Sequence, residues 1–84
     1  MSKLASPAQN KIVSFKFDGD TVYTIEKDTA KIYTANAYSL STQKPIKCRY
    51  GIPAGLNINA INFIGKHLFI IYQENDSFYL LTIK

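Results

Sequence analysis

IVSFKFDGDTVYTI, at residues 12–25, is the stretch that decides the fold. Val13, Phe15 and Phe17 alternate with polar residues, and a strand with this period of two buries one face and exposes the other. The Asp-Gly pair that follows favours a tight turn, because glycine tolerates the positive φ that such hairpins need. The stretch therefore predicts two antiparallel strands joined at Gly19, with the three apolar side chains on the buried face.

A second copy of this pattern follows 46 positions later. Its members are Ile61, Phe63, Gly65, Leu68, Phe69 and Ile71, which correspond in order to Phe15, Phe17, Gly19, Val22, Tyr23 and Ile25. A register error of one residue would exchange buried for exposed side chains. We therefore expect equivalent residues to occupy equivalent hairpins and to point inward or outward alike in both copies.

The rest of the chain predicts an all-β domain of about seven antiparallel strands, with no helix. A third strand is expected at 31–40 and a last one at 78–83. The face expected for the third strand consists of Ile32, Thr34, Tyr38 and Leu40. A fourth strand is expected at 46–50, where Ile46, Cys48 and Tyr50 alternate with Lys47 and Arg49.

The domain organisation follows from the breaks in this pattern. Residues 1–10 contain Ser, Pro, Gln and Asn with one isolated Leu, and predict a flexible N-terminal arm. Residues 11–84 predict a single β domain. The segment 51–55, which contains Pro53, separates a first meander unit at 11–50 from a second at 57–84.

The first unit contains the segments TVYTIEKD, AKIYTANAYSLST and KPIK after its opening strand and Asp-Gly turn. This arrangement resembles the blades of WD40-like and quinoprotein-like β-propellers, and a repeat spacing in the forties is typical of such blades. In these blades the third strand ends in an aromatic residue, a small polar residue and Leu or Ile. Tyr38, Ser39 and Leu40 fit that description, and Leu81, Thr82 and Ile83 are similar. The resemblance implies about one and three-quarter blades; a small β-barrel or sandwich is the alternative fold.

Composition limits the class of protein. The chain has 84 residues, of which 46% are hydrophobic, and a net charge of +4. Its single cysteine, Cys48, forms no intrachain disulfide, which favours a reducing compartment. The sequence shows no signal peptide and no run of roughly 20 apolar residues, so a soluble, cytoplasmic protein is expected.

The sequence predicts no catalytic residue, metal site or cofactor. His67 is the only histidine, and one histidine supplies neither a catalytic triad nor a set of metal ligands. Asp18 and Asp20 are explained by the turn they flank. Cys48 is expected to be a small hydrophobic residue on the inner face. We therefore expect a protein that is not an enzyme.

The last strand predicts the partner-binding site. An apolar strand at a sheet edge is normally paired or covered. The expected contact residues are Phe78, Tyr79, Leu80, Leu81 and Ile83. The leading interpretation is a protein–protein interaction module that forms a homo-oligomer or completes its sheet with a larger partner by strand addition.

A cationic surface gives the alternative interpretation. Lys44, Lys47 and Arg49, together with Lys66 on the second unit's hairpin, could contact a phosphate backbone. An exposed aromatic ring such as Tyr33 or Tyr50 would stack on a base. This hypothesis describes a small basic β-protein that binds single-stranded nucleic acid. A solvated face that prevents aggregation explains the same charges.

Overall fold

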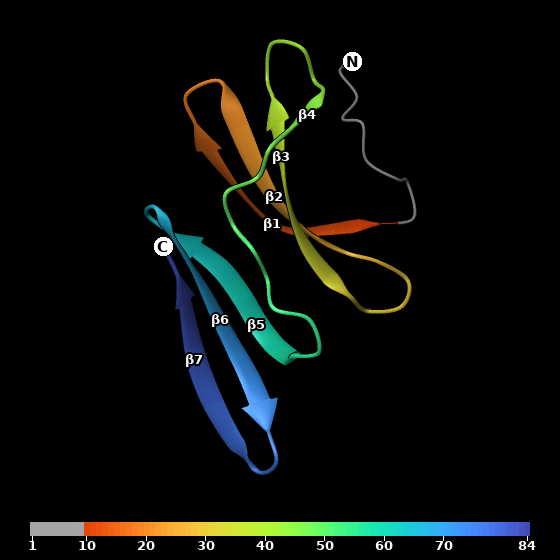
Figure 1. Ribbon diagram of the computed structural model, residues 1–84, viewed down its shortest axis with the longest axis vertical. Coiled ribbons are helices and arrows are strands. Elements are labelled where there is room, and N and C mark those ends of the chain that lie inside the picture. Colours follow the sequence, from red (N-terminus) through yellow and green to blue (C-terminus); the bar gives the residue numbers. More distant parts are fainter. Residues whose placement is uncertain (1–9) are drawn as a thin grey trace.

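A computed structural model describes residues 10–84, which form seven strands in two antiparallel sheets (Figure 1). The first sheet contains β1 (Lys11–Asp18), β2 (Thr21–Lys27), β3 (Tyr33–Ser39) and β4 (Pro45–Ile46). The second sheet contains β5 (Asn57–Ile64), β6 (His67–Glu74) and β7 (Ser77–Ile83). Each sheet is ordered as in the sequence, so the predicted all-β fold of two consecutive meanders is confirmed. The predicted arm at 1–10 lies outside the described residues, apart from Asn10.

The two sheets share the register of their first two strands. β1 and β5 begin 46 positions apart, and so do β2 and β6. The cross-strand pair Phe17–Val22 recurs as Phe63–Leu68. A bulge interrupts both ladders at equivalent places, between residues 12 and 14 in β1 and between residues 58 and 60 in β5. The sequence repeat therefore reflects a structural one.

The two first hairpins are also equivalent. Each has a two-residue loop, which follows Asp18 in the first sheet and Ile64 in the second. Gly19 and Gly65 occupy the first loop position with φ of 61° and 60°, a left-handed backbone that glycine adopts without strain. The predicted equivalence of these two glycines is confirmed.

The two units bury opposite faces, so the prediction that equivalent residues point inward or outward alike in both copies is wrong, and so is the predicted orientation of β1. Phe15 and Phe17 are 60% and 61% exposed, whereas their equivalents Ile61 and Phe63 pack against the core. Val13 lies in the bulge and is also exposed. The reason is that the sheets stack with one face of the first unit against the opposite face of the second. The first unit contributes the face that carries Ile25.

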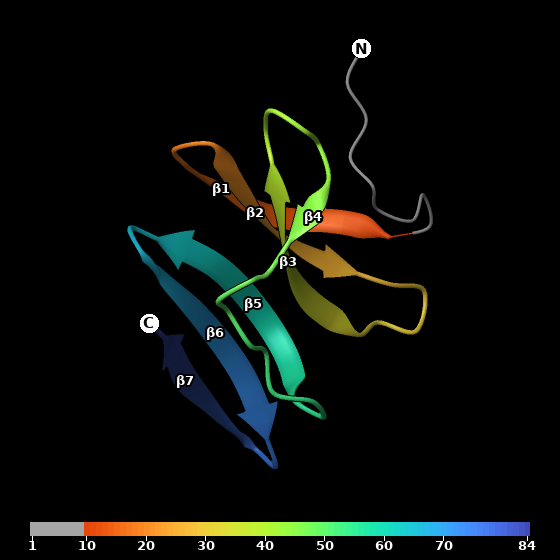
Figure 2. The same ribbon diagram turned by 45° about the horizontal axis from the view of Figure 1, so that its top comes forward.

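The core lies between the two sheets. It includes part of the segment 47–56 between β4 and β5, which we call the linker. The buried residues of the core are Ile25, Tyr50, Leu68 and Ile70. The Tyr50 ring meets the rings of Tyr23 and Phe63 edge-on, with centroid distances of 5.1 and 5.3 Å. The backbone of the linker passes from the first sheet to the second (Figure 2). Its side chains also join the two sheets, because Tyr50 packs in the core between them.

Two predicted strands are shorter than expected. β4 ends at Ile46, because the chain turns from the first sheet toward the second, and Ile46 is 44% exposed while Tyr50 is buried. β3 lacks the predicted ends of 31–40: Ile32 and Leu40 lie outside it and are exposed. Lys31 has a positive φ of 63°, and the Asp28 carboxylate accepts a 2.9 Å hydrogen bond from the Ile32 backbone N–H. These features close the loop before β3.

Residues 10–84 contain no helix of the length and apolarity needed to cross a membrane.

Candidate protein-binding surface

β7 is the open edge of the second sheet. Within residues 10–84 it pairs only with β6, in a ladder that runs without a bulge from Leu68–Ile83 to Glu74–Ser77. Its sequence, SFYLLTI, contains no charged residue, proline or glycine. Bulges, lysines and prolines are the usual features that block an edge strand. Nothing in the sequence of β7 therefore opposes pairing with a further strand.

The predicted contact residues of β7 divide into two sets. Phe78 and Leu80 lie on the outer face and are each 64% exposed. Tyr79 lies on the same face as Leu81 and Ile83, where it is 46% exposed and stacks on Tyr72 with a centroid distance of 5.5 Å. Leu81 and Ile83 instead pack against the core. Because side chains alternate along a strand, β7 offers only part of the predicted set to a partner.

An apolar surface continues from β7 across the second sheet. Its members are Ala60, Ile64, Phe69, Ile71, Phe78 and Leu80, which we call the second outer face. Ile64 is 62% exposed and Ile71 is 42% exposed. Most of this face, together with Val13, lines an open hollow of about 520 Å³. Exposed contiguous apolar surface of this kind marks interaction sites.

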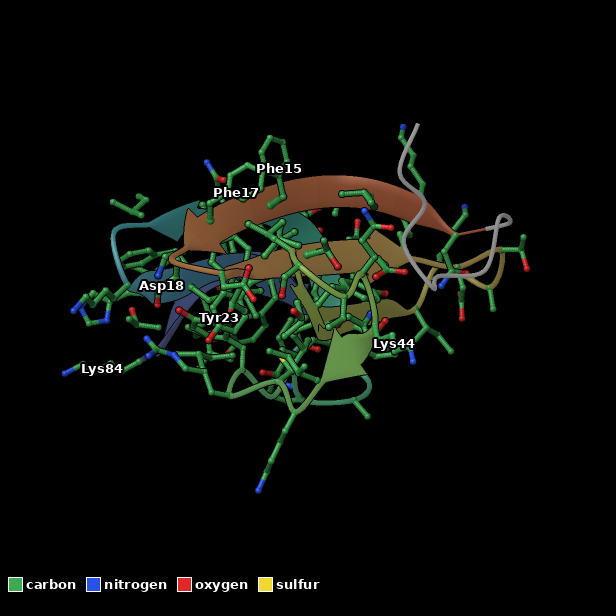
Figure 3. All side chains as sticks on the ribbon, turned by 90° about the horizontal axis from the view of Figure 1, so that it is seen from above. Phe15, Phe17, Asp18, Tyr23, Lys44 and Lys84 are labelled. Atoms are coloured by element: carbon green, nitrogen blue, oxygen red, sulfur yellow. The ribbon has the colours of Figure 1, made fainter. Side chains whose placement is uncertain are left out.

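The first sheet also exposes apolar side chains on the face turned away from the core. Ile12, Phe15 and Phe17, which we call the first outer face, are 44%, 60% and 61% exposed. The two phenylalanine rings contact each other at a centroid distance of 5.5 Å. Figure 3 shows both rings on the opposite side of β1 from Tyr23. This exposure is confined to β1, because Val22, Thr24 and Tyr38, which the register places on the same face, are only 1–5% exposed.

The cationic residues do not form the predicted platform around Tyr50. Tyr50 is only 4% exposed, so its expected role as an accessible stacking ring is wrong. Its hydroxyl donates a 2.8 Å hydrogen bond to the Lys66 carbonyl oxygen. The Arg49 guanidinium donates to the same carbonyl at 3.1 Å and to the Tyr50 hydroxyl at 3.2 Å. Arg49 thus ties the linker to the β5–β6 turn, whereas Lys44 and Lys47 are exposed outside this network.

Sequence reasoning missed a buried polar cluster in the first sheet. Glu26 is 1% exposed, and its carboxylate accepts hydrogen bonds from the Thr24 hydroxyl at 2.8 Å, the Tyr38 hydroxyl at 2.8 Å and the Asn36 amide at 3.0 Å. The sequence contained a pattern that indicates this cluster. Thr24 and Glu26 are two residues apart on β2, and Asn36 and Tyr38 are two residues apart on β3, so all four lie on one face of the paired strands. The cluster fixes the pairing of β2 with β3.

The remaining reactive side chains have local roles. Burial raises the pKa of the Cys48 thiol, and its Sγ donates to the Tyr50 carbonyl oxygen at 3.6 Å. The Asp20 carboxylate accepts from the Ser39 hydroxyl at 3.0 Å and from the Ser41 backbone N–H at 3.1 Å. His67 is exposed beside Phe69. In the part of the chain that the structure describes, no three His, Cys, Asp or Glu residues are grouped as metal ligands would be.

Comparison with known proteins supplies no relative from which a role can be transferred. No protein-family model, no curated protein and no solved structure matches this chain.

Proposed function

We propose that this protein is a non-enzymatic association module that binds a protein partner, including copies of itself, through its second sheet. The observation that supports the proposal is an open, uncharged β7 edge continuous with the second outer face. A strand added at β7 would satisfy the unpaired backbone groups, and alternate side chains would supply specificity. The unpaired Cys48 fits a cytoplasmic setting.

The free energies of burial and of association indicate that β7 and the second outer face act together. Full burial of an exposed side chain of this kind is worth about 1.5–3 kcal/mol, and Phe78 and Leu80 are each 64% exposed, so burying what remains of both would contribute about 2–4 kcal/mol. Association costs at least about 4 kcal/mol in lost translational and rotational freedom. Two side chains therefore at most offset that cost. Ile64 and Ile71, which are also exposed, would supply the surplus.

The test measures, on the same samples, the mass of the protein in solution and the protection of the β7 amides from hydrogen exchange. Light scattering at micromolar concentration should give a mass above the 9.5 kDa monomer. Hydrogen exchange at alternate β7 amides should slow as the protein concentration rises. Leu80→Lys should reduce the association, whereas Ile32→Lys, a control in a loop at 57% exposure, should leave it unchanged.

A strict monomer at high concentration with rapidly exchanging β7 amides would contradict self-association through this sheet. In that event Phe78→Lys would alter neither the mass nor the exchange of β7.

A further inference from the structure

The backbone groups on the open edge of β7 follow from its pairing with β6. A two-residue loop joins Glu74 and Ser77, which form a ladder pair, and such a loop closes on a hydrogen-bonded pair. Hydrogen-bonded and non-hydrogen-bonded pairs alternate along an antiparallel ladder. The N–H and C=O groups of Phe78, Leu80 and Thr82 therefore point away from β6. Figures 1 and 2 show β7 on the side of the second sheet that is farther from the first sheet.

A strand with these outward groups can pair with itself. In an antiparallel arrangement about Leu80, this residue lies opposite Leu80 of a second copy, and Phe78 lies opposite Thr82. These three residues have outward backbone groups, as a hydrogen-bonded pair requires. The alternating side chains also correspond, since Tyr79 then lies opposite Leu81 on the inner face. The edge of β7 is therefore complementary to its own copy.

The charges beside β7 agree with this arrangement. β7 itself is uncharged, and the charged residues next to it in the chain are Asp76 before it and Lys84 after it. Both are exposed. They are equally far from Leu80 in the sequence, so pairing about Leu80 places Asp76 of each copy opposite Lys84 of the other. A shift of two residues, the smallest that keeps the hydrogen bonds, separates these charges. Opposite charges at facing positions stabilise a strand pair.

We propose that this protein forms a symmetric dimer in which β7 pairs antiparallel with β7 of a second copy, about Leu80. The proposal rests on the proposed function, since it names the partner of the β7 edge. Two three-stranded sheets thereby become one continuous sheet. The partner is a copy of this chain because the charges that flank β7 complement each other. The contact joins identical surfaces, so assembly stops at two copies.

The experiment exchanges the flanking charges in the full chain. Lys84→Asp places like charges opposite each other at both ends of the strand pair, and we expect the dimer dissociation constant to rise by roughly 5- to 30-fold at low salt. The same change lowers the net charge of +4, which by itself would favour association. Asp76→Lys combined with Lys84→Asp makes the facing charges opposite again and should return the constant to near that of the wild type. Sedimentation equilibrium measures the constants.

A matched control makes the same charge change away from the edge. Lys47→Asp alters an exposed position in the linker and should not weaken the dimer. An isotope-filtered NOE experiment on a mixture of labelled and unlabelled wild-type chains reports the register directly, with contacts expected between Phe78 and Thr82 of different copies. Thermal unfolding checks that each variant stays folded, and Lys84→Glu repeats the test should Lys84→Asp unfold.

Other outcomes overturn the proposal in distinguishable ways. If Leu80→Lys weakens the dimer and Lys84→Asp does not, association through the second sheet stands and the pairing about Leu80 is wrong. If the double variant fails to recover the dimer that Lys84→Asp weakens, the facing charges are wrongly assigned and so is the register. A wild-type mass above that of two copies contradicts the closed dimer. A strict monomer overturns both this pairing and the proposed self-association.

Discussion

The hydroxyl of Tyr38 donates a 2.8 Å hydrogen bond to Oε2 of Glu26, and the two side chains are only 3% and 1% exposed. They come from neighbouring strands, and the same oxygen also accepts from Thr24 and Asn36. A buried carboxylate is costly unless donors surround it. This cluster therefore makes the pairing of β2 and β3 specific.

Removal of the Tyr38 hydroxyl tests that role. Tyr38→Phe should lower the free energy of unfolding by about 1–3 kcal/mol, because it deprives the buried Glu26 carboxyl group of a hydrogen-bond donor. Urea denaturation monitored by circular dichroism measures the change. Tyr79→Phe, at an exposed position on β7, is the control and should change stability little. Equal effects of the two variants would show that the Tyr38 bond contributes nothing.

Adjacent isoleucines on β6 separate stability from association. Ile70 is fully buried and Ile71 is 42% exposed on the opposite face. Ile70→Val should cost about 0.5–1.5 kcal/mol through a lost buried methylene. Ile71→Val should stay within about 0.5 kcal/mol, as surface substitutions usually do. Thermal unfolding at a concentration where the chain is monomeric measures both; a larger loss for Ile71→Val would reverse the assigned faces.

The two hairpin glycines should respond alike to alanine. At Gly19 and Gly65 an added Cβ meets no atom within 4 Å, so the cost comes only from the positive φ. Each substitution should destabilise by about 1–2 kcal/mol. Gly51→Ala, which also has open space but no positive φ, should be neutral or slightly stabilising. Unequal costs at the two hairpins, measured by chemical denaturation, would contradict their structural equivalence.

The Cys48 thiol should be slow to alkylate at neutral pH. Its raised pKa, caused by burial, leaves less thiolate than a free cysteine has at the same pH, and the thiolate is the nucleophile. The rate should rise with pH later than that of a cysteine in an unfolded peptide. Reaction with iodoacetamide between pH 7 and 10, followed by mass spectrometry, gives the profile. A rate equal to that of the peptide at pH 7 would mean that the thiol is not shielded.

Nucleic-acid binding through the cationic residues should be weak. Tyr50 is buried and therefore cannot stack on a base, and Arg49 is engaged with the Lys66 carbonyl. At about 50 mM salt, where exposed charges are little screened, we expect no more than nonspecific binding of single-stranded DNA. Fluorescence anisotropy with wild-type protein and a Lys44→Glu, Lys47→Glu variant checks this. A steep salt dependence lost in the variant would restore the hypothesis.

The hairpins and the register were predictable because they depend on local features. A period-two pattern and a glycine that tolerates positive φ act within one hairpin, so residues 12–25 and their repeat carried enough information. The period-two pattern shows only that one face of β1 is apolar. Which face is covered depends on where the second sheet packs. Phe15 and Phe17 were therefore assigned to the wrong side.

The candidate surface was predictable only in part for the same reason. The apolar character of β7 identified it as an edge that needs a neighbour. Alternation along the strand then divides its side chains, so that Leu81 and Ile83 belong to the core while Phe78 and Leu80 remain exposed. The period-two pattern at 46–50 predicted a strand that ends instead at Ile46. The backbone leaves the first sheet there, because the Tyr50 side chain fills the space between the two sheets.

Because Tyr50 packs between Tyr23 and Phe63, the linker also determines whether half of this chain can exist alone. A fragment that ends at residue 50 would leave the Ile25 face and the Tyr50 ring uncovered, and one that starts at residue 51 would leave the Phe63 face without its aromatic neighbour. Separately expressed halves should therefore stay insoluble or unfolded. They should regain structure only when co-produced, as two pieces of one split protein that assemble around a single tyrosine.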